Sequence, residues 1–96
     1  MIMYEELLRE IGLSVNEARV YEALLELGES SVQDISLKSK VHRRNVYDSI
    51  NKLIEKGLAS EVIKSQKNFK AIHPRRLLEL LKEKEAKLNK SLPDLE

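Results

Sequence analysis

The sequence predicts a mainly α-helical fold with one small β-hairpin, and three observations support this prediction. Apolar residues recur at helical spacing through most of the 96-residue chain. Residues 31–58 have the pattern of a short helix, a tight turn and a longer helix. Two stretches with β-branched or aromatic residues, 58–63 and 69–72, then flank a polar segment, as in a hairpin.

Two helices are expected before residue 30. The first covers residues 1–11 and stops at Gly12. The second opens with the Ser-x-x-Glu capping box formed by Ser14 and Glu17, and it ends at Gly28. Apolar residues of the second helix repeat at helical spacing, so we expect them in the core: Ala18, Tyr21, Leu24 and Leu25.

The segment 31–58 predicts a pair of helices joined by a short turn. The Ser31 hydroxyl can cap the first helix, and the second opens at His42 and stops at Gly57. Apolar residues of the second helix form one stripe: Val46, Tyr47, Ile50, Leu53 and Ile54. At about 100° per residue, polar residues occupy the opposite face: Arg44, Asn45, Asp48, Asn51, Lys52 and Glu55. This pattern is typical of a helix-turn-helix, whose second helix reaches base edges in the DNA major groove.

The hairpin predicted after Gly57 would make this a winged helix-turn-helix. Its expected tip, residues 64–68, is polar and basic. Lys64, Lys67 and Lys70 suit contacts with phosphate groups. The tip contains no glycine, so the sequence does not predict the type of turn.

A boundary is expected at His73-Pro74, since proline suits the first turn of a helix. We therefore expect a winged-helix domain over residues 1–73 and a C-terminal helix within residues 74–96. Four leucines of that helix fit heptad positions: Leu78, Leu81, Leu88 and Leu92. The helix can fold back on its own domain or pair with a second chain. We favour a homodimer, because one helix-turn-helix reads only a short site.

The net charge of +1 divides unevenly along the chain. Residues 1–37 carry a net charge of −6, residues 38–70 carry +6, and residues 71–96 carry +1. The positive block coincides with the predicted second helix and hairpin, where a surface that binds a polyanion is expected. An ordinary solvated surface is the alternative for the charge pattern alone.

Other features exclude several classes of protein. The chain has no cysteine, no long apolar run and no glycine-rich phosphate loop, so we expect a cytoplasmic protein that does not enter a membrane. The two histidines are isolated and no carboxylates cluster, which disfavours an enzyme and a metal site. We expect no cofactor.

Double-stranded DNA is the expected partner, and the base-reading residues are expected at the start of the second helix. Arg44 and Asn45 suit guanine and adenine edges, respectively, with phosphate contact as the alternative. Asp48 can accept from a cytosine amine or orient Arg44, and we favour the second role. The full set of expected DNA contacts is Ser31, Gln33, His42, Arg43, Arg44, Asn45, Tyr47, Asp48, Lys52, Lys64, Lys67, Asn68 and Lys70.

Two sequence blocks resemble the archaeal TrmB-type sugar-responsive transcriptional regulators. The first reads Leu13-Ser14-x-x-Glu17-Ala18-Arg19-Val20-Tyr21-x-Ala23-Leu24-Leu25-x-Leu27-Gly28. The second reads Val41-x-Arg43-x-x-Val46-Tyr47-Asp48-x-Ile50-x-x-Leu53-x-x-Lys56-Gly57-Leu58. The resemblance covers about residues 5–80. It implies a winged-helix DNA-binding domain, contacts from Arg43 and its neighbours, and a dimer formed by helices after the wing.

The chain departs from the family pattern at three places. Lys40 stands where a small residue or glycine is usual, His42 stands where proline is common, and the wing tip lacks the usual glycine. The larger effector-binding domain of the family is also absent, so nothing supports a small-molecule effector. The chain is either a stand-alone DNA-binding member or a sequence that stops before such a domain.

Three functional classes remain open at this point. The sequence favours a sequence-specific transcription regulator. A non-specific architectural DNA or chromatin binder is the second class, and a winged helix used for protein interaction is the third. Strength of DNA binding, its salt dependence and its preference between sequences distinguish the three.

Overall fold

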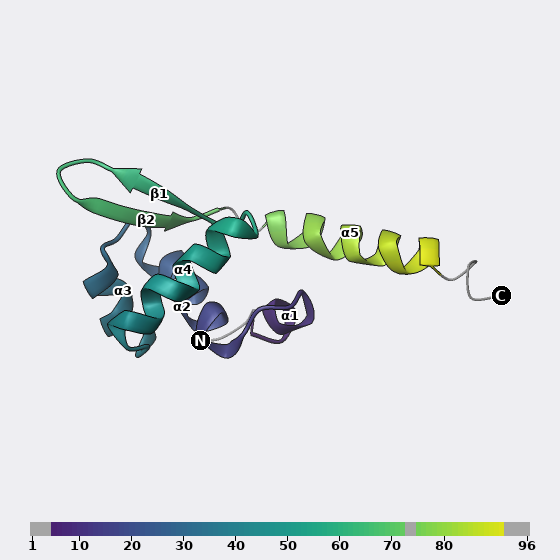
Figure 1. The fold of residues 1–96 in the computed structure, drawn as a ribbon, viewed down its shortest axis with the longest axis horizontal. Coiled ribbons are helices and arrows are strands. Elements are labelled where there is room, and N and C mark those ends of the chain that lie inside the picture. The colour runs from purple at the N-terminus through teal and green to yellow at the C-terminus, as the bar shows by residue number, and fades with distance from the viewer. Residues whose placement is uncertain (1–4, 73–74, 92–96) are drawn as a thin grey trace.

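The computed structural model describes residues 5–72 and 75–91 and confirms a mainly helical fold with one hairpin. Figure 1 shows α2, α3 and α4 packed together below the hairpin, with α5 extending away from them. The elements in order are α1 (Glu5–Glu10), α2 (Val15–Leu27), α3 (Val32–Ser39), α4 (Arg43–Glu55), β1 (Ala59–Ile63), β2 (Lys67–Ala71) and α5 (Arg75–Ser91). This arrangement is a winged helix-turn-helix.

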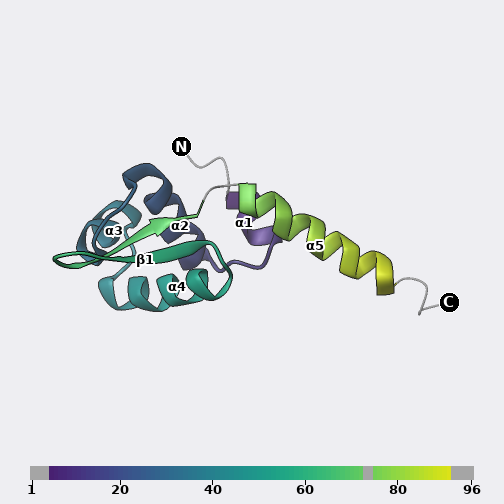
Figure 2. The same ribbon diagram turned by 90° about the horizontal axis from the view of Figure 1, so that it is seen from above.

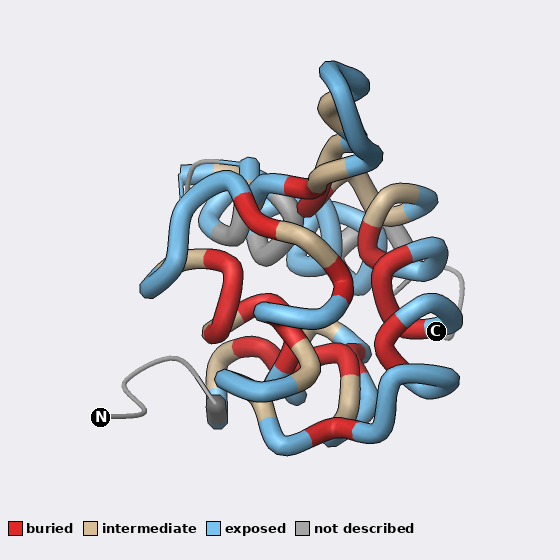
Figure 3. Tube along the Cα trace, turned by 90° about the vertical axis from the view of Figure 1, so that its left-hand side faces the viewer, coloured by how far each residue is buried: buried red, intermediate tan, exposed pale blue. Residues whose placement is uncertain are grey.

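A single apolar core joins α1 through β2. Its largest fully buried side chains include Tyr21 and Leu24 of α2, Ile35 of α3, and Ile50 and Leu53 of α4. In Figure 3 the buried positions line the inner sides of the helices and the base of the hairpin, whereas the hairpin tip is exposed. All four residues of α2 expected in the core pack there, although Leu25 is only partly buried: Ala18, Tyr21, Leu24 and Leu25.

The turn of the hairpin is tighter than the sequence suggested, because the second strand begins earlier. The antiparallel register pairs Ala59 with Ala71 and Ile63 with Lys67, so β2 begins two residues before the expected Phe69. The tip is therefore residues 64–66, closed by the Lys64 N–H donating to the Gln66 carbonyl at 3.2 Å. No residue of this tip has a positive φ, so the turn does not require the missing glycine.

The hairpin is fixed to the helices at two points. Ser30, in the turn between α2 and α3, pairs with Phe69 through two backbone hydrogen bonds of 2.9 Å. Tyr21 is fully buried, and its hydroxyl donates to the Ile72 carbonyl at 2.9 Å. Because these contacts join the wing to α2 and to the turn before α3, they fix its position relative to the helices.

The turn between α3 and α4 is short, as expected, and consists of Lys40, Val41 and His42. Ser31 caps α3 by accepting from the Asp34 N–H at 3.3 Å. At the other end of α3, Lys40 has a φ of 61°, in the left-handed region. The Ser36 hydroxyl then donates to the Val41 carbonyl at 2.7 Å and fixes the entry to α4. Glycine suits the position of Lys40 because it has no Cβ to clash in this conformation.

Replacing Lys40 with glycine should therefore stabilise the protein. The left-handed conformation costs a residue with a Cβ roughly 1–2 kcal/mol, and the extra freedom of glycine in the unfolded chain offsets part of that gain. We expect the Lys40→Gly variant to raise the free energy of unfolding by about 0.5–1 kcal/mol in urea titrations. Lys52→Gly, inside α4, is the control and should lose about 1 kcal/mol. A loss at both positions would contradict the strain at Lys40.

Candidate nucleic-acid interface

Helix α4 presents a polar face at its N-terminal end, as the sequence predicted. His42 is the N-cap, and its Nδ1 accepts from the Arg44 N–H at 3.2 Å. The buried residues of α4 are Val46, Ser49, Ile50 and Leu53, and the first two turns expose Arg43, Arg44, Asn45 and Asp48. The predicted apolar stripe differs at one position: Tyr47 is 45% exposed, and Ser49 is buried on this face instead.

The cations on this face are available for a ligand. Within residues 5–72 and 75–91, no ion pair involves Arg43, Arg44 or Lys52, all of which are exposed. The expected pairing of Asp48 with Arg44 is absent from the same residues, so Asp48 does not orient this guanidinium in the free protein. A cationic side chain that forms no ion pair within the protein can bind an anion without first breaking a contact.

A hollow of about 270 Å³ lies where α3, α4 and the wing meet. The residues around it are Ser31, Val32 and Gln33 of the α3 start, Arg43 and Tyr47 of α4, and Gln66, Lys67 and Phe69 of the wing. The structure thus brings together five residues that the sequence analysis proposed from separate segments. The hollow combines a guanidinium, an ammonium, a phenol and the N-terminal end of a helix, a set that favours an anionic group.

The remaining wing residues lie on the other side of the hairpin. Side chains alternate along a strand, so Asn68 and Lys70 face away from the side that carries Lys67 and Phe69. Asn68 donates to Glu29 at 3.1 Å, and Lys64 at the tip forms an ion pair with the same carboxylate at 3.4 Å. The expected wing contacts therefore do not form one surface. Glu29 was not among the expected residues, since no local pattern in the sequence connects residue 29 with residues 64 and 68.

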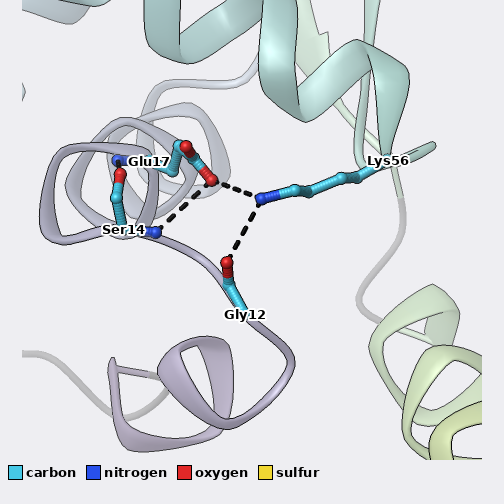
Figure 4. Close-up of polar contacts among 4 residues, drawn as sticks. All are labelled: Gly12, Ser14, Glu17 and Lys56. Carbon is cyan, nitrogen blue, oxygen red and sulfur yellow. Dashed lines mark hydrogen bonds and ion pairs between the residues drawn. The ribbon is translucent and has the colours of Figure 1, made fainter.

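The far end of α4 is held by a polar network around Glu17, shown in Figure 4. The predicted capping box is present, with the Glu17 N–H donating to the Ser14 Oγ at 3.1 Å. The buried Glu17 carboxylate also accepts from Lys56 Nζ at 2.6 Å, and Lys56 donates to the Gly12 carbonyl at 3.3 Å. Lys56 is the C-cap of α4, so this contact sets where the helix ends relative to α2.

The charge of Glu17 depends on this network. Burial raises the pKa of Glu17, but the hydrogen bonds from Lys56 and Ser14 outweigh burial, so its pKa lies below the ordinary value. The folded state therefore binds this proton less readily than the unfolded chain does.

Helix α5 extends from the body in both perpendicular views (Figures 1 and 2). Of the four leucines expected at a dimer interface, Leu78 is 56% and Leu88 is 59% exposed. The side chain of Leu81 and all of Leu92 lie outside the described residues. Lys84 ties the helix to α1 by donating to the Glu10 carbonyl. Within the described part of the chain, no helix has the length and apolarity needed to cross a membrane, and no cluster of side chains suits a metal ion.

Comparison with known proteins identifies the family. A family model described as sugar-specific transcriptional regulator TrmB matches residues 8–75. The chain belongs to the TrmB family. The TrmB family consists of transcriptional regulators rather than enzymes, which confirms the expectation from the sequence.

Two relatives in this family are similar over most of this chain. The HTH-type sugar sensing transcriptional regulator TrmBL1 of Pyrococcus furiosus is 28% identical over 85 residues, which is 85% of this chain and 25% of that protein. The structure of TrmBL2, described as an archaeal chromatin protein with a novel mode of DNA binding, has a TM-score of 0.81 at 27% identity. That match covers 93% of this chain and 35% of TrmBL2, so the chain spans 25% of the length of one relative and 35% of the other.

The fold extends beyond the TrmB family. A MarR family transcriptional regulator from Silicibacter pomeroyi has a TM-score of 0.65 at 19% identity, covering 94% of this chain and 60% of that one. This likeness confirms the winged-helix fold.

The Glu17–Lys56 pair should make stability depend on pH. Because the folded-state pKa of Glu17 is lowered, its contribution is present above the ordinary carboxyl pKa and is lost as the pH falls through the lowered value. At neutral pH, Glu17→Gln should lose about 1 kcal/mol, the difference between a charged and a neutral hydrogen bond. Thermal melts from neutral pH down through the lowered pKa of Glu17 should show the melting temperatures of wild type and variant converging. An equal gap at every pH, or none at neutral pH, would contradict the assignment. Glu26→Gln, in an exposed pair, is the control.

Proposed function

We propose that this chain is a sequence-specific double-stranded DNA-binding domain of a transcriptional regulator. Helix α4 enters the major groove of the DNA, and the wing lies along the sugar-phosphate backbone of the DNA. The observation that carries this proposal is the exposed start of α4, where Arg43 and Arg44 have no acidic partner among the described residues and where Arg43 lines the hollow under the wing.

Different residues have different roles in this proposal. Arg44 and Asn45 read base edges, with Asp48 as a further acceptor on the same face. The hollow receives the DNA backbone at the edge of the major groove, and Arg43, Tyr47 and Lys67 surround one phosphate there. Further contacts with the DNA backbone come from Ser31, Gln33, His42 and Lys52, and from the wing residues Lys64, Asn68 and Lys70. Phosphate contacts fix the position of the protein, and base contacts select the sequence.

A non-specific chromatin binder is the second candidate function. The observation that favours it is the likeness to TrmBL2, which is described as an archaeal chromatin protein. The two candidates use the same phosphate contacts, but only a specific regulator depends on Arg44 and Asn45 for sequence preference. No comparable observation favours the third functional class, a winged helix used for protein interaction.

We also propose a homodimer built through α5, with residues 1–73 as the DNA-binding unit and residues 74–96 as the dimerisation element. Leu78 and Leu88 are exposed on a helix that leaves the body, which supports a partner for this face. Pairing about a two-fold axis would place two α4 helices on one side of the DNA.

Substitutions on α4 and on the wing should have different effects on DNA binding. Arg44→Ala or Asn45→Ala should cost roughly 1–3 kcal/mol on the preferred site and relax preference at one base pair in each half-site. Lys67→Ala should weaken binding to all duplexes about equally and reduce the slope of log affinity against log salt by about 1 per subunit. Fluorescence anisotropy on single-base variants of the site measures both effects. Uniform weakening by all three variants would remove the base-reading assignment.

The dimer proposal makes a separate prediction. Leu78→Glu combined with Leu88→Glu should convert a dimer into a folded monomer, because two charges would face each other across the pairing surface. Leu37→Glu, at a leucine of α3 that is 72% exposed, should leave the association state unchanged. Sedimentation distinguishes monomer from dimer at protein concentrations of tens of micromolar, which are on the order of the dissociation constants of weak dimers. A wild-type monomer at such concentrations rules out the dimer.

A further inference from the structure

Glu29 belongs to the turn between α2 and α3, but its carboxylate contacts the wing. Oε2 lies 3.4 Å from Lys64 Nζ and accepts a hydrogen bond from Asn68 Nδ2 at 3.1 Å. Residues 64 and 68 are more than thirty positions further along the chain. An acidic side chain of the body therefore contacts two wing residues that the DNA-binding proposal assigns to the backbone of the nucleic acid.

The backbone holds Glu29 at this place. The next residue, Ser30, is buried and pairs with Phe69 through two backbone hydrogen bonds of 2.9 Å. Its hydroxyl also donates to the Gly28 carbonyl at 3.0 Å. Because neighbouring residues in a strand face opposite sides, pairing of Ser30 with Phe69 directs Glu29 to the side of Asn68. The contact thus follows from the isolated bridge between Ser30 and Phe69, which lies outside the two named strands.

Glu29 is ionised at neutral pH. The hydrogen bond from Asn68, together with the nearby Lys64 and Lys70, holds the pKa of Glu29 below its ordinary value. Its charge consequently lies beside two of the three wing lysines. The Lys64 ammonium is a compact charge on a flexible stem, and its side chain is well exposed, so it can exchange one anionic partner for another.

Resting on the proposed function, we propose that Glu29 competes with DNA phosphate for Lys64. In the free protein Glu29 holds Lys64 on the outer side of the wing, and DNA binding transfers the ammonium to the backbone. The contact lowers affinity for every duplex by the same factor and leaves the base preference unchanged, since phosphate contacts carry no sequence information. Glu29 thereby limits non-specific binding, which is almost entirely electrostatic.

The test compares DNA affinity of the full chain and its Glu29→Gln variant by fluorescence anisotropy. Glutamine keeps the size of the side chain and an oxygen that accepts from Asn68, so only the charge is removed. We expect binding to tighten on the order of two- to five-fold, the range that exposed ion pairs support. This gain should shrink as salt rises, because salt screens exposed charges. Glu26→Gln removes the same charge from an exposed pair with Lys38 and controls for net charge.

The gain must also depend on Lys64. On a Lys64→Gln background, Glu29→Gln should have no more effect than Glu26→Gln. The proposal is overturned if the gain persists on that background, if Glu29→Gln matches Glu26→Gln in the wild type, or if Glu29→Gln weakens binding at an unchanged melting temperature. In each of those cases a wild type that binds DNA leaves the proposed function standing. If the wild type binds no duplex even at low salt, the proposed function fails and this inference falls with it.

Discussion

The packing of α4 against α2 is the constraint on which the other features of this winged helix depend. Val46, Ile50 and Leu53 are fully buried or nearly so, and they face the core that Tyr21 and Leu24 occupy from α2. Truncating one such leucine or isoleucine to alanine costs about 2–5 kcal/mol, a large share of the stability of a small domain. Since one face of α4 must be buried, the face with Arg44 and Asn45 must be exposed.

Polar contacts then fix what the apolar core leaves adjustable. The Glu17–Lys56 pair holds the end of α4, while Ser36 and the left-handed Lys40 set its start. The Ser30–Phe69 pairing and the Tyr21 hydroxyl hold the wing. Each of these contacts contributes little to the free energy of folding. Each nevertheless fixes the relative position of segments that apolar packing alone would not determine. The hollow between α3, α4 and the wing owes its shape to them.

Local signals in the sequence were sufficient to predict the helices and the presence of a hairpin. Ser14 and Glu17 predicted a capping box that is present, Gly57 predicted the end of α4, and the polar start of α4 is exposed as expected. Periodicity was less informative at Tyr47, because a residue at the edge of an apolar stripe can lie inside or outside the core. The hairpin tip was misjudged because polar residues such as Lys67 and Asn68 pair in a strand when their partners are present. Glu29 and Lys56 act through long-range contacts, which no local pattern encodes.

The central claim is that the exposed start of α4 selects a DNA sequence, and selection from a random pool tests it most directly. The full chain would be incubated with randomised duplexes at physiological salt, and bound DNA would be amplified and sequenced over several rounds. We expect enrichment of one motif with two inverted half-sites whose centres lie about one helical turn, or a multiple of it, apart. Retention of DNA through every round without enrichment of any motif would contradict it and would leave a non-specific chromatin binder in its place.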